Sequence, residues 1–205
     1  MGEFISQVLS ALVQFGVIWL ILKIFWTIRE KPMGGQFADY LGFKAPKGNI
    51  NKILGYSVGS LLAFCAVGFL ILKALPDPSI LANGKFTVLN VWTTLSILVY
   101  AFIQTSLTEE LLFRGFLAKR FIVKFGFIKG NLIQAILFGI LHVALLVSAG
   151  LNVFVIVLIG IFTGVIGYIL CWIDEKLALG SIYPSWIIHG LSNVVSSLMI
   201  IFVLK

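Results

Sequence analysis

Residues 105–116 read TSLTEELLFRGF and place Glu109 and Glu110 side by side in a segment that is otherwise nearly all apolar. A carboxylate inside a membrane span costs about 2.5 to 3.5 kcal/mol unless it faces the protein interior and has a partner there. The chain has only two histidines, His142 and His189, and both also lie within apolar runs. This distribution predicts a polar, catalytic type of site built inside a membrane.

The composition of the chain indicates an integral membrane protein. Of its 205 residues, 60% are hydrophobic and 11% are charged, whereas soluble domains carry about 25% charged residues and less than half apolar ones. The net charge of +7 comes from basic residues between hydrophobic segments, where they set topology and meet anionic lipid. We therefore expect contact with membrane lipid and none with nucleic acid. Cys65 and Cys171 lie in apolar runs and are expected to be free thiols.

Six segments are long and apolar enough to cross a bilayer, which takes about 20 residues. They are separated by breaks rich in Pro, Gly and Asn, and they cover residues 4–28, 53–75, 87–112, 131–149, 151–173 and 183–204. The third is expected to continue as an amphipathic helix through residues 114–127. The predicted fold class is therefore all-α: one polytopic transmembrane helical bundle over residues 1–205, with about six spans and the active site buried between helices.

Basic residues gather in the links that follow the first and the third span. The positive-inside rule places both links in the cytoplasm and both termini outside. On that orientation Glu109, His142 and His189 fall in the same half of the bilayer, at about 1.5 Å of rise per residue. The expected location is the plasma membrane of a prokaryotic cell. The basic residues in question are Arg29, Lys31, Lys44, Lys47, Lys52, Arg114, Lys119, Arg120, Lys124 and Lys129.

Two glycine pairs have the spacing of one helical turn. They are Gly55 with Gly59, and Gly160 with Gly164. Small residues at this spacing let membrane helices approach closely, so we expect both pairs to lie at helix contacts rather than to form hinges.

Glu110 and Arg114 lie four residues apart and therefore share a helix face. Their pairing would neutralise one carboxylate and leave Glu109, which points in another direction, to act. The alternative is a solvated patch of charges at the cytoplasmic end of the helix.

Both histidines belong to further pairs with the same spacing. His142 follows Phe138 by four residues, and Asn193 follows His189 by four. Each pair taken singly has a structural explanation: a hydrogen-bonded core histidine for the first, and for the second an interhelical hydrogen bond worth about 1 kcal/mol or less. Because these residues lie at matching depths in the bilayer, together they indicate a shared site.

Together these three segments resemble the motifs of the CAAX prenyl endopeptidase and bacteriocin-processing family (CPBP, or Abi) of intramembrane proteases. That family shows Glu-Glu-x-x-x-Arg, Phe-x-x-x-His and His-x-x-x-Asn on separate helices, in the order found here. The similarity covers roughly residues 88–200, which we take as the CPBP-like catalytic core. The matching residues are Glu109, Glu110, Arg114, Phe138, His142, His189 and Asn193.

The resemblance implies a role for each residue. Glu109 and His142 would activate a water molecule, and His189 with Asn193 would bind the oxyanion. His142 would otherwise steer the water or protonate the leaving amine, and the sequence leaves these roles open. Glu110, Arg114 and Phe138 would support the site.

Metal dependence is a separate question, because two histidines and a carboxylate form one type of catalytic zinc set. That set would be His142, His189 and Glu109. The His-Glu-x-x-His helix of many metalloproteases is absent from the sequence, and Asn193 is a better oxyanion donor than zinc ligand. We therefore expect no required cofactor, with zinc as the alternative.

The predicted function is an intramembrane endopeptidase, of the glutamate or the metallo type. It would cleave a hydrophobic, leader-type or lipid-modified peptide near the cytoplasmic face. The alternative is a bacteriocin self-immunity or membrane scaffold protein that retains the protease fold. A small transporter would also explain intramembrane Glu, His and Arg, but the chain shows no repeated halves. The sequence does not determine the oligomeric state.

Overall fold

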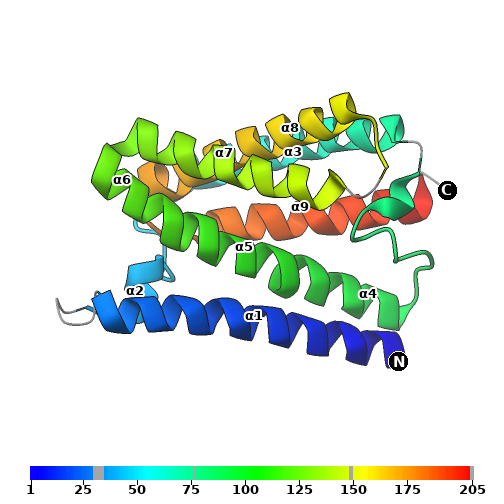
Figure 1. The fold of residues 1–205 in the computed structure, drawn as a ribbon, viewed down its shortest axis with the longest axis horizontal. Coiled ribbons are helices and arrows are strands. Elements are labelled where there is room, and N and C mark those ends of the chain that lie inside the picture. Colours follow the sequence, from blue (N-terminus) through cyan, green and yellow to red (C-terminus); the bar gives the residue numbers. More distant parts are fainter. Residues whose placement is uncertain (30–34, 76, 148–149, 204–205) are drawn as a thin grey trace. The chain divides into compact units, whose positions relative to one another are not determined.

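The computed structural model describes residues 1–29, 35–75, 77–147 and 150–203, and this part of the chain is helical with no strand. It contains six helices that are long and apolar enough to cross a membrane, which confirms the predicted all-α fold and six spans (Figure 1). These helices are Gly2–Arg29, Ile50–Ala74, Val91–Phe125, Phe127–Leu146, Val153–Leu177 and Tyr183–Phe202.

Some of these spans contain several helical segments. The third runs through α4, η3, α5, η4 and α6, and the fifth joins α8 to η6; η3, η4 and η6 are π-helical, and η2 is a 3₁₀ turn. The bounds are α1 Gly2–Arg29, α2 Phe37–Leu41, α3 Ile50–Ala74, η2 Pro78–Ile80, α4 Val91–Leu98, η3 Val99–Leu107, α5 Thr108–Glu110, η4 Leu111–Ala118, α6 Lys119–Phe125, α7 Phe127–Leu146, α8 Val153–Trp172, η6 Ile173–Leu177 and α9 Tyr183–Phe202.

Local chemistry sets several of these boundaries. The Asn90 side chain accepts a hydrogen bond from the Thr93 amide and caps α4, and Asn152 caps α8 in the same way. Gly126, at φ 77°, separates α6 from α7 because side chains rarely adopt that conformation. The fourth span therefore begins four residues earlier than predicted. The predicted ends at 149 and 204 lie outside the described residues.

The chain divides into two compact units. The first unit comprises Met1–Gly35, Ser57–Glu110 and Trp186–Lys205, and the second comprises Gln36–Tyr56 and Leu111–Ser185. The single domain predicted over residues 1–205, and the catalytic core predicted over 88–200, stay predictions.

In the first unit, α1 packs along η3 (Figure 1), and a row of glutamines joins the two helices. Gln7 donates to the Gln104 side chain, and Gln14 donates to the Gln104 carbonyl oxygen at 3.0 Å. Lys85 donates to Gln7 Oε1 at 2.7 Å. Polar side chains inside an apolar environment are stable when they bond to one another, so this row aligns α1 with the helix that carries the two glutamates.

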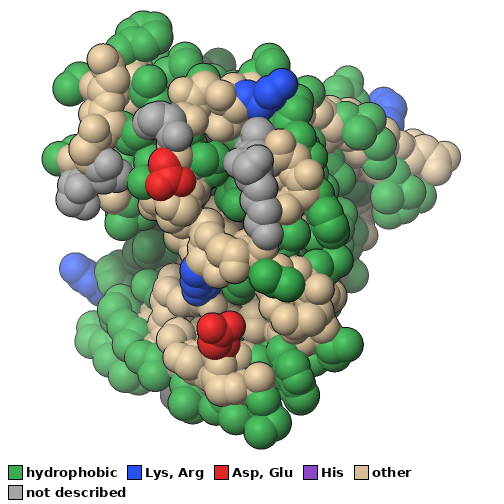
Figure 2. Space-filling view, turned by 90° about the vertical axis from the view of Figure 1, so that its right-hand side faces the viewer, with side chains coloured by type: hydrophobic (Ala, Val, Ile, Leu, Met, Phe, Trp, Pro, Cys, Tyr) green, Lys and Arg blue, Asp and Glu red, His purple; other side chains and the backbone are tan. Residues whose placement is uncertain are grey.

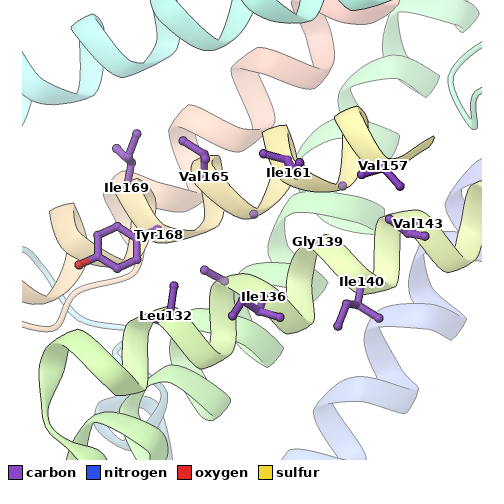
Figure 3. Close-up of a pocket in the computed structure, with 13 residues that line it drawn as sticks. Leu132, Ile136, Gly139, Ile140, Val143, Val157, Ile161, Val165, Tyr168 and Ile169 are labelled. Carbon is purple, nitrogen blue, oxygen red and sulfur yellow. The ribbon is translucent and has the colours of Figure 1, made fainter. Parts of the chain in front are cut away.

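In the second unit, α7 and α8 lie against each other (Figure 3). A Cβ at Gly139 would stand 2.4 Å from the Gly160 carbonyl oxygen, and one at Gly164 would stand 3.2 Å from that of Ala135. The close packing predicted for Gly160 and Gly164 is therefore confirmed.

The other glycine pair behaves differently. A Cβ added at Gly55 or Gly59 would meet none of the described atoms within 4 Å. The close contact predicted there is wrong, because the spacing of glycines does not tell which face of a helix another helix covers.

Large hydrophobic side chains cover much of the surface, as Figure 2 shows for one face. On α1, for example, Leu9, Val13 and Leu20 are all more than half exposed. Such a surface is suited to lipid rather than to water.

Candidate active site

His189 lies between the two adjacent glutamates in the first unit. Its Nδ1 is 2.8 Å from Glu110 Oε1, and its Nε2 is 3.9 Å from Glu109 Oε2. The Glu110 side chain is completely buried, whereas that of Glu109 is 22% exposed. The structure thus brings together three of the predicted site residues, from α5 and α9.

The short contact determines how the His189 ring is used. An ionised carboxylate only accepts hydrogen bonds. While Glu110 is ionised, Nδ1 therefore carries the hydrogen of this bond, and Nε2 is the nitrogen that faces Glu109. A carboxylate that fixes one ring nitrogen and so aims the other is a recurring arrangement in hydrolases.

The second oxygen of Glu109 is placed to act on a small polar group. Oε2 is buried, and no hydrogen-bond donor among the described residues reaches it. Its 3.9 Å separation from His189 Nε2 is too long for a direct hydrogen bond, but one water oxygen about 2.8 Å from each atom would fit between them. Glu109 and His189 can therefore contact the same water or substrate atom.

Asn193, one turn after His189 on α9, bonds to hydroxyl groups on η3. Its Nδ2 donates to Thr105 Oγ1 at 2.9 Å and to Ser106 Oγ at 3.4 Å. The Thr105 hydroxyl in turn donates to the Tyr100 carbonyl oxygen at 2.9 Å. Because its hydrogens have these partners, Asn193 joins α9 to η3 in this structure, and its predicted oxyanion role stays a prediction.

The approach of α9 to η3 depends on a glycine that sequence reasoning missed. A Cβ at Gly190 would stand 2.4 Å from the Phe102 ring, and Trp186 Nε1 donates to the Phe102 carbonyl oxygen at 2.6 Å. Gly190 directly follows the motif residue His189. A glycine at that position was the sequence signal that could have indicated a close helix contact beside the site.

Irregular helix surrounds the two glutamates. The π-helical η3 ends just before α5, and the π-helical η4 begins directly after Glu110. Such segments carry i→i+5 hydrogen bonds and occur frequently at functional sites. They turn the side chains out of the register of an ordinary α-helix.

In the second unit, Arg114, Phe138 and His142 form a stack. The buried Arg114 guanidinium lies 4.2 Å from the centre of the Phe138 ring, which is 4.5 Å from that of His142. His142 Nδ1 lies 2.8 Å from the Phe138 carbonyl oxygen, and because a carbonyl only accepts, Nδ1 carries the hydrogen. Nε2 is then the ring nitrogen that remains for another partner.

These residues belong to a different unit from Glu109, Glu110 and His189. The prediction that His142 shares a pocket with Glu109 therefore stays a prediction, as does the pairing of Glu110 with Arg114.

The zinc set of His142, His189 and Glu109 stays a prediction, because His142 belongs to a different unit from the other two residues. Among the described residues, no three His, Cys, Asp or Glu side chains form a group that could hold a metal, and His189 Nδ1 already bonds to Glu110. We derive no chemical step through a metal.

Comparison with known proteins gives one family. The family described as type II CAAX prenyl endopeptidase Rce1-like matches residues 90–195, just over half of the chain. No curated protein and no solved structure matches. The matched region begins at the cap of α4 and ends two residues after Asn193 in α9. It therefore contains all seven motif residues, and together with the six apolar helices it supports an integral, multi-pass membrane protein. The chain belongs to the type II CAAX prenyl endopeptidase Rce1-like family.

Proposed function

We propose that this protein is an intramembrane endopeptidase that cleaves a hydrophobic, leader-type or lipid-modified peptide near the cytoplasmic face of the membrane. Family membership supports peptidase activity. The observation that carries the finer proposal is the position of His189, which Glu110 holds through Nδ1 and which turns Nε2 toward the buried oxygen of Glu109.

Glu109 is the general base in the proposed reaction. It takes a proton from a water molecule held between its Oε2 and His189 Nε2, and the oxygen of that water attacks the carbonyl carbon of the scissile peptide bond. A general base of this kind contributes typically about 10²- to 10⁴-fold in rate. When the C–N bond breaks, that proton passes to the leaving nitrogen. The new carboxylic acid then gives its own proton to the amine, and the products are a carboxylate and an ammonium group.

His189 stabilises the oxyanion that forms on the carbonyl oxygen. For Nε2 to donate, both ring nitrogens must carry hydrogen, and the resulting positive charge lies beside Glu110. One such donor is worth about 10²- to 10³-fold in rate.

The family pattern adds two further residues to this reaction. By resemblance, His142 takes part in activating the water, and Asn193 is a second oxyanion donor. We propose that the reaction needs no metal. Zinc retained stoichiometrically by the purified wild-type protein, with activity lost on chelation, would overturn that part.

The test compares membrane peptides from cells that carry the wild-type protein or Glu109→Gln. We expect one or more uncleaved precursors to accumulate only with Glu109→Gln, and the purified wild-type protein in liposomes to cleave them. Glu3→Gln, which changes an exposed carboxylate in the first turn of α1, is the matched control and should cleave normally. Full cleavage by Glu109→Gln rules out the enzymatic proposal. If that variant also protects cells from a bacteriocin, the immunity alternative replaces it.

A further inference from the structure

The second unit contains an apolar groove along α7 and α8, about 480 Å³ in volume (Figure 3). Glycines bring the two helix backbones together at its floor. Its walls are aliphatic side chains that are all at least 45% exposed: Leu132, Ile136 and Ile140 from α7, with Val157, Ile161 and Val165 from α8.

The length of the groove matches one leaflet of a bilayer. It extends from Leu132 to Val143 on α7, which is about 16 Å at 1.5 Å per residue. The hydrocarbon core of a bilayer is about 30 Å thick, so one acyl chain of one leaflet would extend over the whole groove.

A basic cavity of about 750 Å³ lies next to one end of the groove. On α7, Ile128 in this cavity is one turn from Leu132 in the groove. On α8, Trp172 in the cavity is one turn from Tyr168 in the groove. The groove therefore leads into the cavity along both helices.

The charge of this cavity is positive. Its lining includes the exposed side chains of Lys129 and Lys176 and no carboxylate. Lys176 Nζ lies 4.3 Å from the centre of the Phe127 ring. The neighbouring carboxylate of Glu175 bonds to Lys119 instead. Basic pockets between membrane helices bind anionic headgroups. Tryptophan is enriched at the membrane–water interface, so Trp172 is expected at the level of the headgroups.

We propose that the groove and the basic cavity form one binding site for an anionic membrane phospholipid. One acyl chain lies in the groove between α7 and α8, and the headgroup phosphate lies between Lys129 and Lys176. The charge of the cavity selects this occupant over a zwitterionic lipid, whose net charge is zero.

The test measures lipid binding to the full-length protein in detergent by native mass spectrometry, with phosphatidylglycerol and phosphatidylcholine of identical acyl chains. We expect wild-type protein to retain phosphatidylglycerol at least tenfold more tightly. In the double variant Lys129→Gln/Lys176→Gln, the affinity for phosphatidylglycerol should fall about 30-fold, since each lysine near an anionic headgroup contributes about a factor of five. The matched control Arg29→Gln/Lys73→Gln removes two exposed charges of the first unit and should bind as the wild type does.

A second pair of variants tests the groove without changing charge. Ile161→Trp fills the groove from an exposed position and should weaken phosphatidylglycerol binding at least fivefold, whereas Leu145→Trp, similarly exposed and outside the groove, should not. Equal binding of the two lipids by the wild type would overturn the proposal, as would unchanged binding by the lysine variant. Two further results would overturn it. A dimer that Ile161→Trp dissociates would assign the groove to a second copy of the chain, and displacement of the lipid by a prenylated peptide would assign it to the peptide.

Discussion

The two histidines differ in what holds their Nδ1 atoms. In the first unit the partner of His189 is the carboxylate of Glu110, 79 residues away in the sequence. In the second unit the partner of His142 is the carbonyl oxygen of Phe138, one turn back in the same helix. His189 is thus aimed by tertiary structure, and His142 by its own helix.

This difference has a chemical consequence. A positive charge on His189 would lie beside a carboxylate, whereas one on His142 would lie beside a neutral carbonyl group. We therefore expect His189 to act as a hydrogen-bond donor toward the oxyanion. His142 is expected to act through Nε2, which accepts a proton or orients the water.

Glutamine replacements should separate the two roles most strongly. A glutamine amide places an N–H near the position of Nε2 but cannot accept a proton at neutral pH. We expect His142→Gln to lower kcat about 10³-fold, within the range expected when a group that helps to activate the water is lost. His189→Gln should lower it only about tenfold, against about 10²- to 10³-fold for His189→Ala, which removes the donor. Steady-state kinetics of the purified variants on one peptide measures this, and equal losses for the two glutamine variants would refute the division of roles.

Glu110→Gln should have the next largest effect, because it removes the charge that holds His189. We expect kcat to fall about 10²-fold with KM unchanged. If Glu110 acts only through His189, the double variant Glu110→Gln/His189→Ala should be no slower than His189→Ala alone. Multiplied losses in the double variant would instead show that Glu110 acts independently of His189.

The sequence predicted the spans well because a bilayer imposes a length and a composition on each of them. It also predicted that Phe138 and His142 share a helix face, because α7 is a regular α-helix in which residues four apart do so. Nothing in the spacing identified Glu110 as the partner of His189, since that contact joins two helices distant in the sequence.

The expected pairing of Glu110 with Arg114 stays a prediction. It rests on the four-residue spacing of an ordinary α-helix, whereas Leu111–Ala118 is π-helical, and i→i+5 bonding changes which residues share a face. The basic cavity beside Trp172 was also missed by sequence reasoning. Lys129 lies at the start of α7 and Lys176 follows the end of α8, so only the packing of α7 on α8 brings the two lysines together.

Gly190→Ala should disturb the site that depends on tertiary structure. The added Cβ would stand 2.4 Å from the Phe102 ring, so α9 must move away from η3 or the ring must shift. We expect a loss of about 1 to 3 kcal/mol in the free energy of unfolding, seen as a lower Tm in detergent. Gly55→Ala is the matched control, since its Cβ would meet no described atom within 4 Å, and alanine is preferred in helices by about 0.5–1 kcal/mol. A Tm for Gly190→Ala equal to that of the control would show that α9 does not need this approach.

Thr105→Val should have the smallest effect and should define the role of Asn193. Valine removes the hydroxyl that accepts from Asn193 Nδ2, and such interhelical bonds are worth about 0.6 kcal/mol on average. Thr163→Val is the matched control, because the Thr163 hydroxyl donates only within its own helix. If Asn193 serves to join α9 to η3, Thr105→Val lowers Tm slightly and leaves kcat within about twofold of the wild type. If Asn193 instead donates to the oxyanion, the loss of the Thr105 hydroxyl changes kcat by more than about twofold, while Tm still falls only slightly. The ratio of these two effects, compared with the Thr163→Val control, therefore distinguishes a structural amide from a catalytic one.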